Sequence, residues 1–190
     1  MSTPPLGIIE GYFGAPWSWA DRAATMRFLA PHGYRFFIYA PKADAFLRKR
    51  WREPHPDDQA SALASFAADC RSAGVEFGVG LTPFEAHFDF GAPQREALRA
   101  KLAHLDGLGL DVLAILFDDM RGELADLAAR QLAIVDYAAS HTRARRLVVC
   151  PGYYSDDPVL DRVFGARPAN YLEDLGRGFQ TIAKMLHDRR

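Results

Sequence analysis

The chain has 190 residues, of which 49% are hydrophobic and 25% are charged, a composition typical of one folded globular domain. Its 23 Lys and Arg residues nearly balance its 24 Asp and Glu residues, so the formal charge of -1 excludes a basic field for nucleic acid or for an anionic membrane. The first residues lack the pattern of a secretory signal, and no apolar stretch approaches the ~20 residues that cross a bilayer. We therefore expect a cytoplasmic protein with no nucleic-acid and no membrane partner.

Five short apolar runs recur along the chain and predict strands. Each run is unbroken rather than alternating, as strands buried on both faces of a parallel sheet require. In chain order the runs occupy residues 6–9, 36–39, 77–81, 112–117 and 147–150.

Segments with helical spacing separate these runs. Ser18 stands three residues before Asp21, in the manner of a capping box that begins a helix. Gly33, Gly74 and Gly109 each lie between a predicted helix and the next strand, where glycine commonly ends a helix. The pattern predicts alternating strands and helices, with helices at residues 20–29, 57–73, 94–108 and 123–139.

Such alternation permits an open doubly wound α/β sheet or a closed (β/α)8 barrel. A dinucleotide fold is disfavoured, because the first strand runs into bulky aromatics at residues 10–17 instead of a glycine-rich phosphate loop. Polar and aromatic residues follow the carboxyl end of every predicted strand, which is where barrel enzymes build their sites. These residues are Glu10 and Tyr12, Lys42 and Asp44, Glu85 and His87, Asp118 and Asp119, and Tyr153 and Tyr154.

Five segments, in chain order, resemble the signature segments of glycoside hydrolase family 84. That family contains the O-GlcNAcases and the bacterial β-N-acetylglucosaminidases first called hyaluronidases. The resemblance covers roughly residues 6–178 and implies a TIM-type barrel that cleaves β-N-acetylglucosaminides. The segments are residues 10–17 (EGYFGAPW), 39–44 (YAPKAD), 51–53 (WRE), 116–120 (LFDDM) and 150–154 (CPGYY).

The resemblance assigns catalysis to Asp118 and Asp119. In a retaining, substrate-assisted enzyme the sugar's own 2-acetamido oxygen attacks the anomeric carbon, so Asp118 would orient the acetamide and Asp119 would act as acid and then base. Neighbouring strand residues point to opposite faces, so the strand pattern must break between the two aspartates if they share a pocket. The alternative is that one of them caps the following helix.

The resemblance also implies substrate contacts for Lys42, Gly11 and Tyr154. Lys42 would donate a hydrogen bond to a sugar hydroxyl, or else form an ordinary ion pair with Asp44. Gly11 would present its backbone carbonyl to the sugar, or else provide a tight strand exit. Tyr154 would contact the acetamide region, or else be a buried core phenol.

Other polar and aromatic residues are expected to be structural or are left without a role. Glu85 and His87 depart from the pattern of the O-GlcNAcase branch, and we expect neither to be catalytic. Trp51 is expected to lie in the core. Cys70 and Cys150 have no second Cys or His at metal-ligand spacing, so we expect two buried free thiols, no metal and no cofactor.

A complete (β/α)8 barrel takes about 250 residues. We therefore expect an incomplete barrel of about five βα units plus a C-terminal helix, with barrel sequence at residues 1–178 and a divergent helical tail at 179–190. A natural truncation, a frameshifted reading frame and a fragment all remain open. The open sheet edges predict cover by a second copy or by a complementary fragment.

Two functions follow from the sequence. The first is a β-N-acetylglucosaminidase module that acts on an N-acetylglucosamine-containing glycoside or glycoprotein. The alternative is a catalytically inactive remnant that binds an amino sugar or a protein partner.

Overall fold

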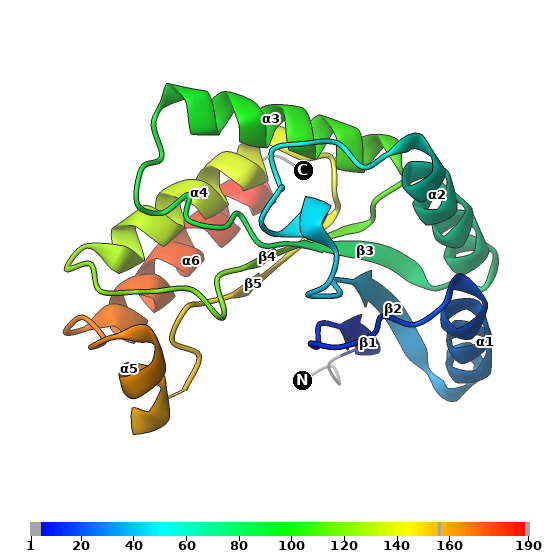
Figure 1. Ribbon diagram of the computed structural model, residues 1–190, viewed down its shortest axis with the longest axis horizontal. Helices are drawn as coiled ribbons and strands as arrows, with labels where there is room; N and C mark the ends of the chain where they lie inside the picture. The colour runs from blue at the N-terminus through cyan, green and yellow to red at the C-terminus, as the bar shows by residue number, and fades with distance from the viewer. Residues whose placement is uncertain (1–4, 156, 189–190) are drawn as a thin grey trace.

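The computed structural model describes residues 5–155 and 157–188, which form one five-stranded parallel sheet. Every strand pairs with the strand that follows it in the chain, in the order β1-β2-β3-β4-β5 (Figure 1). All five predicted strands are present, and β2 begins two residues earlier than expected. Their bounds are β1 Leu6–Glu10, β2 Tyr34–Tyr39, β3 Glu76–Leu81, β4 Val112–Leu116 and β5 Arg146–Cys150.

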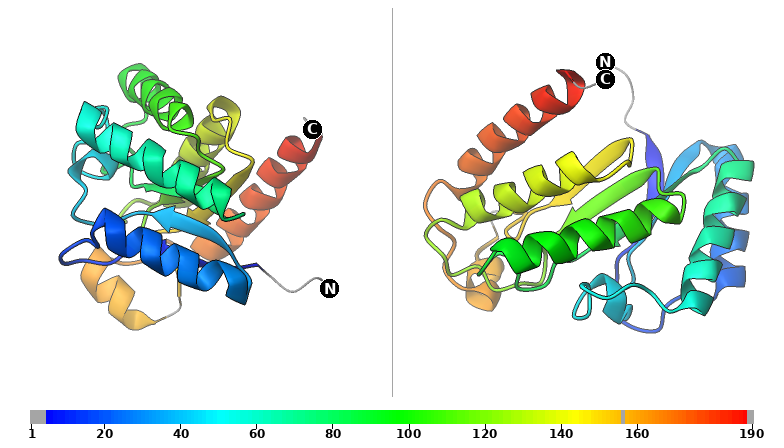
Figure 2. Two further views of the ribbon diagram at one scale, coloured as in Figure 1. Left: turned by 90° about the vertical axis from the view of Figure 1, so that its right-hand side faces the viewer. Right: turned by 90° about the horizontal axis from the view of Figure 1, so that it is seen from above.

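Helices follow the strands in alternation, and the long ones surround one side of the sheet (Figure 2). Unchanging strand order with helices on one face is the arrangement of a (β/α) barrel rather than of a doubly wound sheet, in which the order reverses. The predicted incomplete barrel is thus confirmed. The helices are α1 Trp19–Leu29, α2 Asp57–Ser72, α3 Ala92–Gly107, α4 Leu127–His141, α5 Pro158–Phe164 and α6 Tyr171–Asp188, with short 3-10 turns η1 Ala30–His32 and η2 Ala45–Leu47.

Local sequence signals explain most helix boundaries. The Ser18 hydroxyl accepts a hydrogen bond from the Asp21 amide at 3.1 Å and donates one to the Asp21 carboxylate at 2.7 Å, which confirms the predicted cap. Gly33, Gly74 and Gly109 have φ of 90°, 70° and 86°, the left-handed region that glycine adopts without a Cβ clash.

Two helical predictions need correction. α4 begins at Leu127 rather than at residue 123, because the Gly122 amide donates to the Phe164 carbonyl at 3.0 Å and holds the preceding segment in a loop. The short helix α5 was not predicted, although Asp157 caps it by accepting from the Val159 amide at 2.9 Å.

The outer face of the sheet packs against the helices to form the main core. Large side chains such as Phe37, Phe77 and Leu113 point to this side and are fully buried. The alternate residues face inward and form a separate layer of smaller side chains, which are Ile38, Ala40, Val112, Ala114 and Leu116. If this alternation continues past the end of a strand, it determines the face of the sheet to which each rim side chain points.

On the inner face, β3 contributes Glu76 at its amino end and then only glycines, Gly78 and Gly80. A Cβ placed on Gly80 would lie 2.5 Å from the Cβ of Ala40 and 2.8 Å from Cδ1 of Leu116. A Cβ on Gly78 would lie 2.8 Å from Cγ1 of Ile38. The side chains of β2 and β4 therefore approach each other across β3, which bare backbone permits.

α6 packs against α4 and the outer face of β5. Phe179 and Ile182 face Leu147 and Val149, with a cavity of about 270 Å³ between them. Residues 178 and 179 both lie inside α6, so no break in the helix marks the predicted boundary between the barrel sequence and the C-terminal tail. That boundary stays a prediction.

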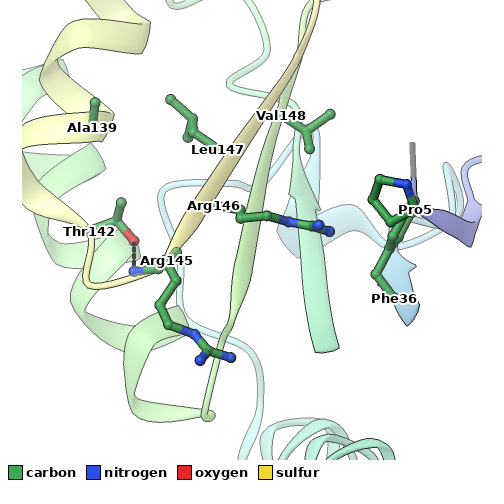
Figure 3. A pocket seen from close by; sticks show the side chains of 9 residues that line it. Pro5, Phe36, Ala139, Thr142, Arg145, Arg146, Leu147 and Val148 are labelled. Carbon is green, nitrogen blue, oxygen red and sulfur yellow. Dashed lines mark hydrogen bonds between the residues drawn. The ribbon is translucent and has the colours of Figure 1, made fainter. Parts of the chain in front are cut away.

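Both edges of the sheet are partly exposed. Leu6 and Ile9 of β1 are half-exposed, and every residue of β5 is only partly buried. Near the amino ends of the strands, Phe36 of β2 and Val148 of β5 line an open cavity of about 430 Å³ (Figure 3).

Both cysteines are free thiols, as predicted. Cys70 is fully buried, and burial raises its pKa to about 12. Cys150 is only half-buried, which corrects the expectation of full burial, because β5 lies at the edge of the sheet. Within residues 5–155 and 157–188, no helix has the length and apolar character that a membrane crossing requires.

Candidate active site

Asp118 and Asp119 lie directly beyond the carboxyl end of β4. The alternation of β4 places Asp118 on the inner face, in line with Leu116, and would send Asp119 to the outer face. Asp119 instead has φ of 60°, in the left-handed region that Asp tolerates better than most residues. The break in strand geometry that the sequence required therefore occurs at Asp119 itself.

Lys42 joins the two carboxylates. Its Nζ lies 2.5 Å from Oδ2 of Asp118 and 3.1 Å from Oδ2 of Asp119. The Lys42 side chain is only 3% exposed, whereas those of Asp118 and Asp119 are 20% and 28% exposed. One buried ammonium thus faces two carboxylates that remain accessible from the rim.

The alternative ion pair between Lys42 and Asp44 is wrong. Asp44 is buried and accepts hydrogen bonds from the Tyr39 hydroxyl at 3.0 Å, from the Phe46 amide at 2.9 Å and from Nε2 of His55 at 3.2 Å. Burial opposes ionisation of Asp44, but the hydrogen bonds and the charge of His55 outweigh it and lower the pKa of this carboxyl.

The helix-cap alternative for the aspartates is also wrong. α4 begins at Leu127, and Asp126 occupies its N-cap position. Asp118 in fact keeps a free acceptor, because its Oδ1 is buried and has no hydrogen-bond partner among the residues that the structure describes. A buried, unpaired carboxylate oxygen is costly, so this atom marks where a donor from a ligand would bind.

Gly11 follows β1 on the inner face of the sheet. Its φ is not in the left-handed region, and a Cβ there would meet only Cγ2 of Ile9, at 3.5 Å. The strand exit therefore does not require glycine. The next residue, Tyr12, accepts a hydrogen bond from the Lys42 amide at 3.2 Å, which ties this segment to the cluster.

Tyr153 and Tyr154 have opposite environments. Tyr153 is the buried phenol, and its hydroxyl donates to the Gly165 carbonyl at 2.7 Å. Tyr154 is 53% exposed and makes no hydrogen bond within the described parts of the chain, so the core-phenol alternative for Tyr154 is wrong. The structure brings Lys42, Asp118 and Asp119 together, and within the described residues no hydrogen bond joins Tyr154 to them.

Three other rim residues are structural. Glu10 is buried and forms a two-point ion pair with Arg22, at 2.7 and 2.9 Å. His87 is buried and its Nε2 lies 2.8 Å from the Arg121 carbonyl. Trp51 is fully buried, as expected, and its Nε1 donates to the Phe84 carbonyl at 3.2 Å.

Sequence reasoning missed Arg48. Its Nη2 lies 3.4 Å from the backbone carbonyl of Asp119, and its guanidinium lies 5.5 Å from the ring of Phe13 and 5.2 Å from the ring of Phe84. Arg48 falls between two of the matched segments, so no motif pointed to it. In the described ranges, no group of three or more His, Cys, Asp or Glu side chains is placed to hold a metal ion.

A parallel (β/α) barrel sheet with paired carboxylates at its carboxyl rim is an arrangement that glycoside hydrolases use. The family model for β-N-acetylglucosaminidase matches residues 6–185. The chain belongs to this family, and the resemblance to glycoside hydrolase family 84 is confirmed.

Known proteins agree with this assignment. The Protein O-GlcNAcases of Rattus norvegicus and Mus musculus are each 30% identical over 115 residues, which is 60% of this chain and 12% of theirs. A solved mutant of the Thermobaculum terrenum O-GlcNAc hydrolase shares the fold, with a TM-score of 0.70 at 21% identity, over 92% of this chain and 45% of that one. The chain thus spans less than half the length of each of these relatives.

Proposed function

We propose that the chain is a retaining β-N-acetylglucosaminidase module that uses the 2-acetamido group of its substrate as the nucleophile. The observation that carries this proposal is the cluster of Lys42, Asp118 and Asp119, in which Asp118 keeps a buried, unpaired Oδ1. The relatives are O-GlcNAcases and an O-GlcNAc hydrolase, which remove O-linked N-acetylglucosamine.

The two carboxylates divide the work. Oδ1 of Asp118 accepts the acetamide N–H, and this polarises the acetamide so that its oxygen attacks the anomeric carbon and forms a ring intermediate. Asp119 gives its proton to the departing glycosidic oxygen as that bond breaks. It then takes a proton from the water that opens the intermediate, so the product keeps the β configuration.

Lys42 supports both carboxylates and has capacity for the substrate. An ammonium group has three N–H donors, of which one bonds to Asp118, while Asp119 lies at ion-pair distance. A remaining donor is assigned to a sugar hydroxyl. The Gly11 carbonyl and the exposed Tyr154 phenol are assigned to the sugar and to its acetamide, respectively.

The proposed substrate is an N-acetylglucosamine-containing glycoside or glycoprotein. We assign the protein to the cytoplasm. We also propose that a second copy or a complementary fragment covers the open barrel along its edge strands β1 and β5, which are partly exposed.

The test compares substrates with good and poor leaving groups. Asp119→Ala should slow hydrolysis of a poor leaving group by roughly 10²- to 10⁴-fold and spare an activated aryl β-N-acetylglucosaminide, because only the former needs general-acid help. Asp118→Asn should slow both. Asp126→Ala serves as the control, since this exposed carboxylate pairs with Arg130 on α4. Absence of turnover in the folded chain, or equal losses for Asp119→Ala on both substrates, would contradict the proposal.

A second candidate is a remnant that binds an amino sugar or a protein without cleaving a glycoside. The open edges of the sheet favour it, because positioning of a substrate supplies on the order of 7 to 11 kcal/mol in favourable cases and depends on a complete pocket. Calorimetry with a thiazoline-type inhibitor separates the candidates. Binding without turnover supports the remnant, and no binding leaves a structural role.

A further inference from the structure

We infer that Arg48 is a positioning residue that holds Asp119 in the left-handed conformation and so directs its carboxylate to the inner face. The conformational part of this inference is independent of the proposed function. Its catalytic consequence rests on the proposed role of Asp119 as acid and base.

Asp119 needs external support in this conformation. Left-handed φ raises the conformational energy of any residue other than glycine, so Asp119 keeps this conformation only if its surroundings stabilise it. In an extended conformation the Asp119 side chain would follow Phe117's alternation away from Lys42, toward the outer face. The interactions of the Asp119 carboxylate and of the Asp119 backbone carbonyl therefore decide whether the carboxylate points to the inner face.

Two cations from the segment after β2 supply these interactions. Lys42 contacts the Asp119 carboxylate at 3.1 Å, and Arg48 contacts the Asp119 carbonyl oxygen at 3.4 Å. The carboxylate contact alone leaves the peptide plane free to rotate. The Arg48 contact fixes that plane, since the carbonyl direction depends on the backbone dihedral angles.

Arg48 is itself held by its surroundings. Its guanidinium lies against the rings of Phe13 and Phe84, which come from the loops after β1 and β3. Its Nε is buried without a hydrogen-bond partner, and no carboxylate pairs with Arg48 among residues 5–155 and 157–188. The charge is thus not engaged in an ion pair and is available to the Asp119 carbonyl.

The direct test is NMR of the full 190-residue chain. The ¹³Cα and ¹³Cβ shifts and the HN–Hα coupling of Asp119 report its φ. Arg48→Gln should move these values from the left-handed to the extended range, and Arg48→Lys should not restore them, because lysine lacks the planar group that stacks on both rings. Arg50→Gln is the matched control, since Arg50 stacks on Phe46 and pairs with Glu53 at the surface. Unchanged Asp119 signals in Arg48→Gln would overturn the inference.

Phe13→Ala provides a second variant if Arg48→Gln does not fold. The Phe13 ring is 63% exposed, so its removal should leave the fold intact while it loosens Arg48. Asp119 should then show exchange broadening or intermediate shifts. Asp119 signals identical to those of the wild type would count against the inference.

Kinetics separate this inference from the proposed function. In an active protein, Arg48→Gln should slow a poor leaving group at least tenfold more than an activated one, and it should add nothing to Asp119→Ala. Equal losses on both substrates would show a general structural defect instead of positioning. If the wild-type chain shows no turnover, the proposed function fails, and the NMR result alone decides the role of Arg48.

Discussion

The backbone of Asp119 leads to a prediction that needs no enzymatic activity. Asp119→Gly should be more stable than Asp119→Ala, because glycine adopts φ of 60° without the clash that a Cβ causes. Both variants remove the same carboxylate and leave Lys42 with Asp118 alone. Their difference in unfolding free energy therefore isolates the backbone.

The magnitude follows from two opposing effects. Left-handed φ costs alanine roughly 1–2 kcal/mol, whereas the greater freedom of glycine in the unfolded chain costs about 0.4–1 kcal/mol. The unfolding free energy of Asp119→Gly should thus exceed that of Asp119→Ala by about 0.5–1 kcal/mol. At position 118, where φ is not left-handed, only the second effect acts, and Asp118→Ala should be more stable than Asp118→Gly by about 0.4–1 kcal/mol.

Urea unfolding of the four variants at one pH and ionic strength measures both differences. The comparison is valid if the slopes of unfolding free energy against urea agree, because the unfolded states then expose similar surface. If alanine equals or exceeds glycine at position 119, Asp119 is not left-handed, and the geometric basis for pairing the aspartates fails.

Three further predictions concern Lys101, Gly11 and Tyr171. Burial lowers the pKa of Lys101 from 10.5 to about 8, so between those values the unfolded chain binds a proton that the folded chain has released. The wild type should therefore gain stability relative to Lys101→Met as the pH rises from 7 to 10 in urea unfolding, and a constant difference would refute this. Gly11→Ala should raise the unfolding free energy by about 0.4–1 kcal/mol yet weaken binding of a thiazoline-type inhibitor in calorimetry, and unchanged binding would remove Gly11 from the site. Tyr171→Phe should cost about 1–3 kcal/mol in thermal or urea unfolding, because it deprives Gln131 and the Gly152 amide of a buried partner, whereas the exposed Tyr154→Phe should cost almost nothing.

Much of the fold was predictable because its signals are local. Unbroken apolar runs gave the five strands, and the cap at Ser18 and the glycine at position 33 gave helix ends that the structure confirms. The start of α4 was misplaced because it depends on a distant contact, the bond from the Gly122 amide to Phe164. Periodicity within one segment carries no information about such a contact.

The site was predictable as a set of residues but not as a geometry. The sequence pointed to Lys42, Asp118 and Asp119, and it required a break in the strand between the aspartates. It did not show that Lys42 bonds to Asp118 across 76 positions of sequence or that Arg48 approaches Asp119 across 71. Periodicity within one segment does not predict contacts between positions so far apart in the sequence. The catalytic and substrate-binding roles themselves remain predictions.

The two inward glycines of β3 have a consequence for how this site would tolerate sequence change. Lys42 and Asp118 lie just beyond the ends of β2 and β4, two strands that β3 separates and that would be roughly 9.6 Å apart in a flat sheet. They bond because nothing stands between the inner faces of β2 and β4, where a single methyl group on Gly80 would already touch both neighbours. A strand that contributes no functional group thus sets the spacing of the charged ones. Substitution of Gly78 or Gly80 would therefore disrupt the cluster of Lys42, Asp118 and Asp119 even if all three charged residues were kept.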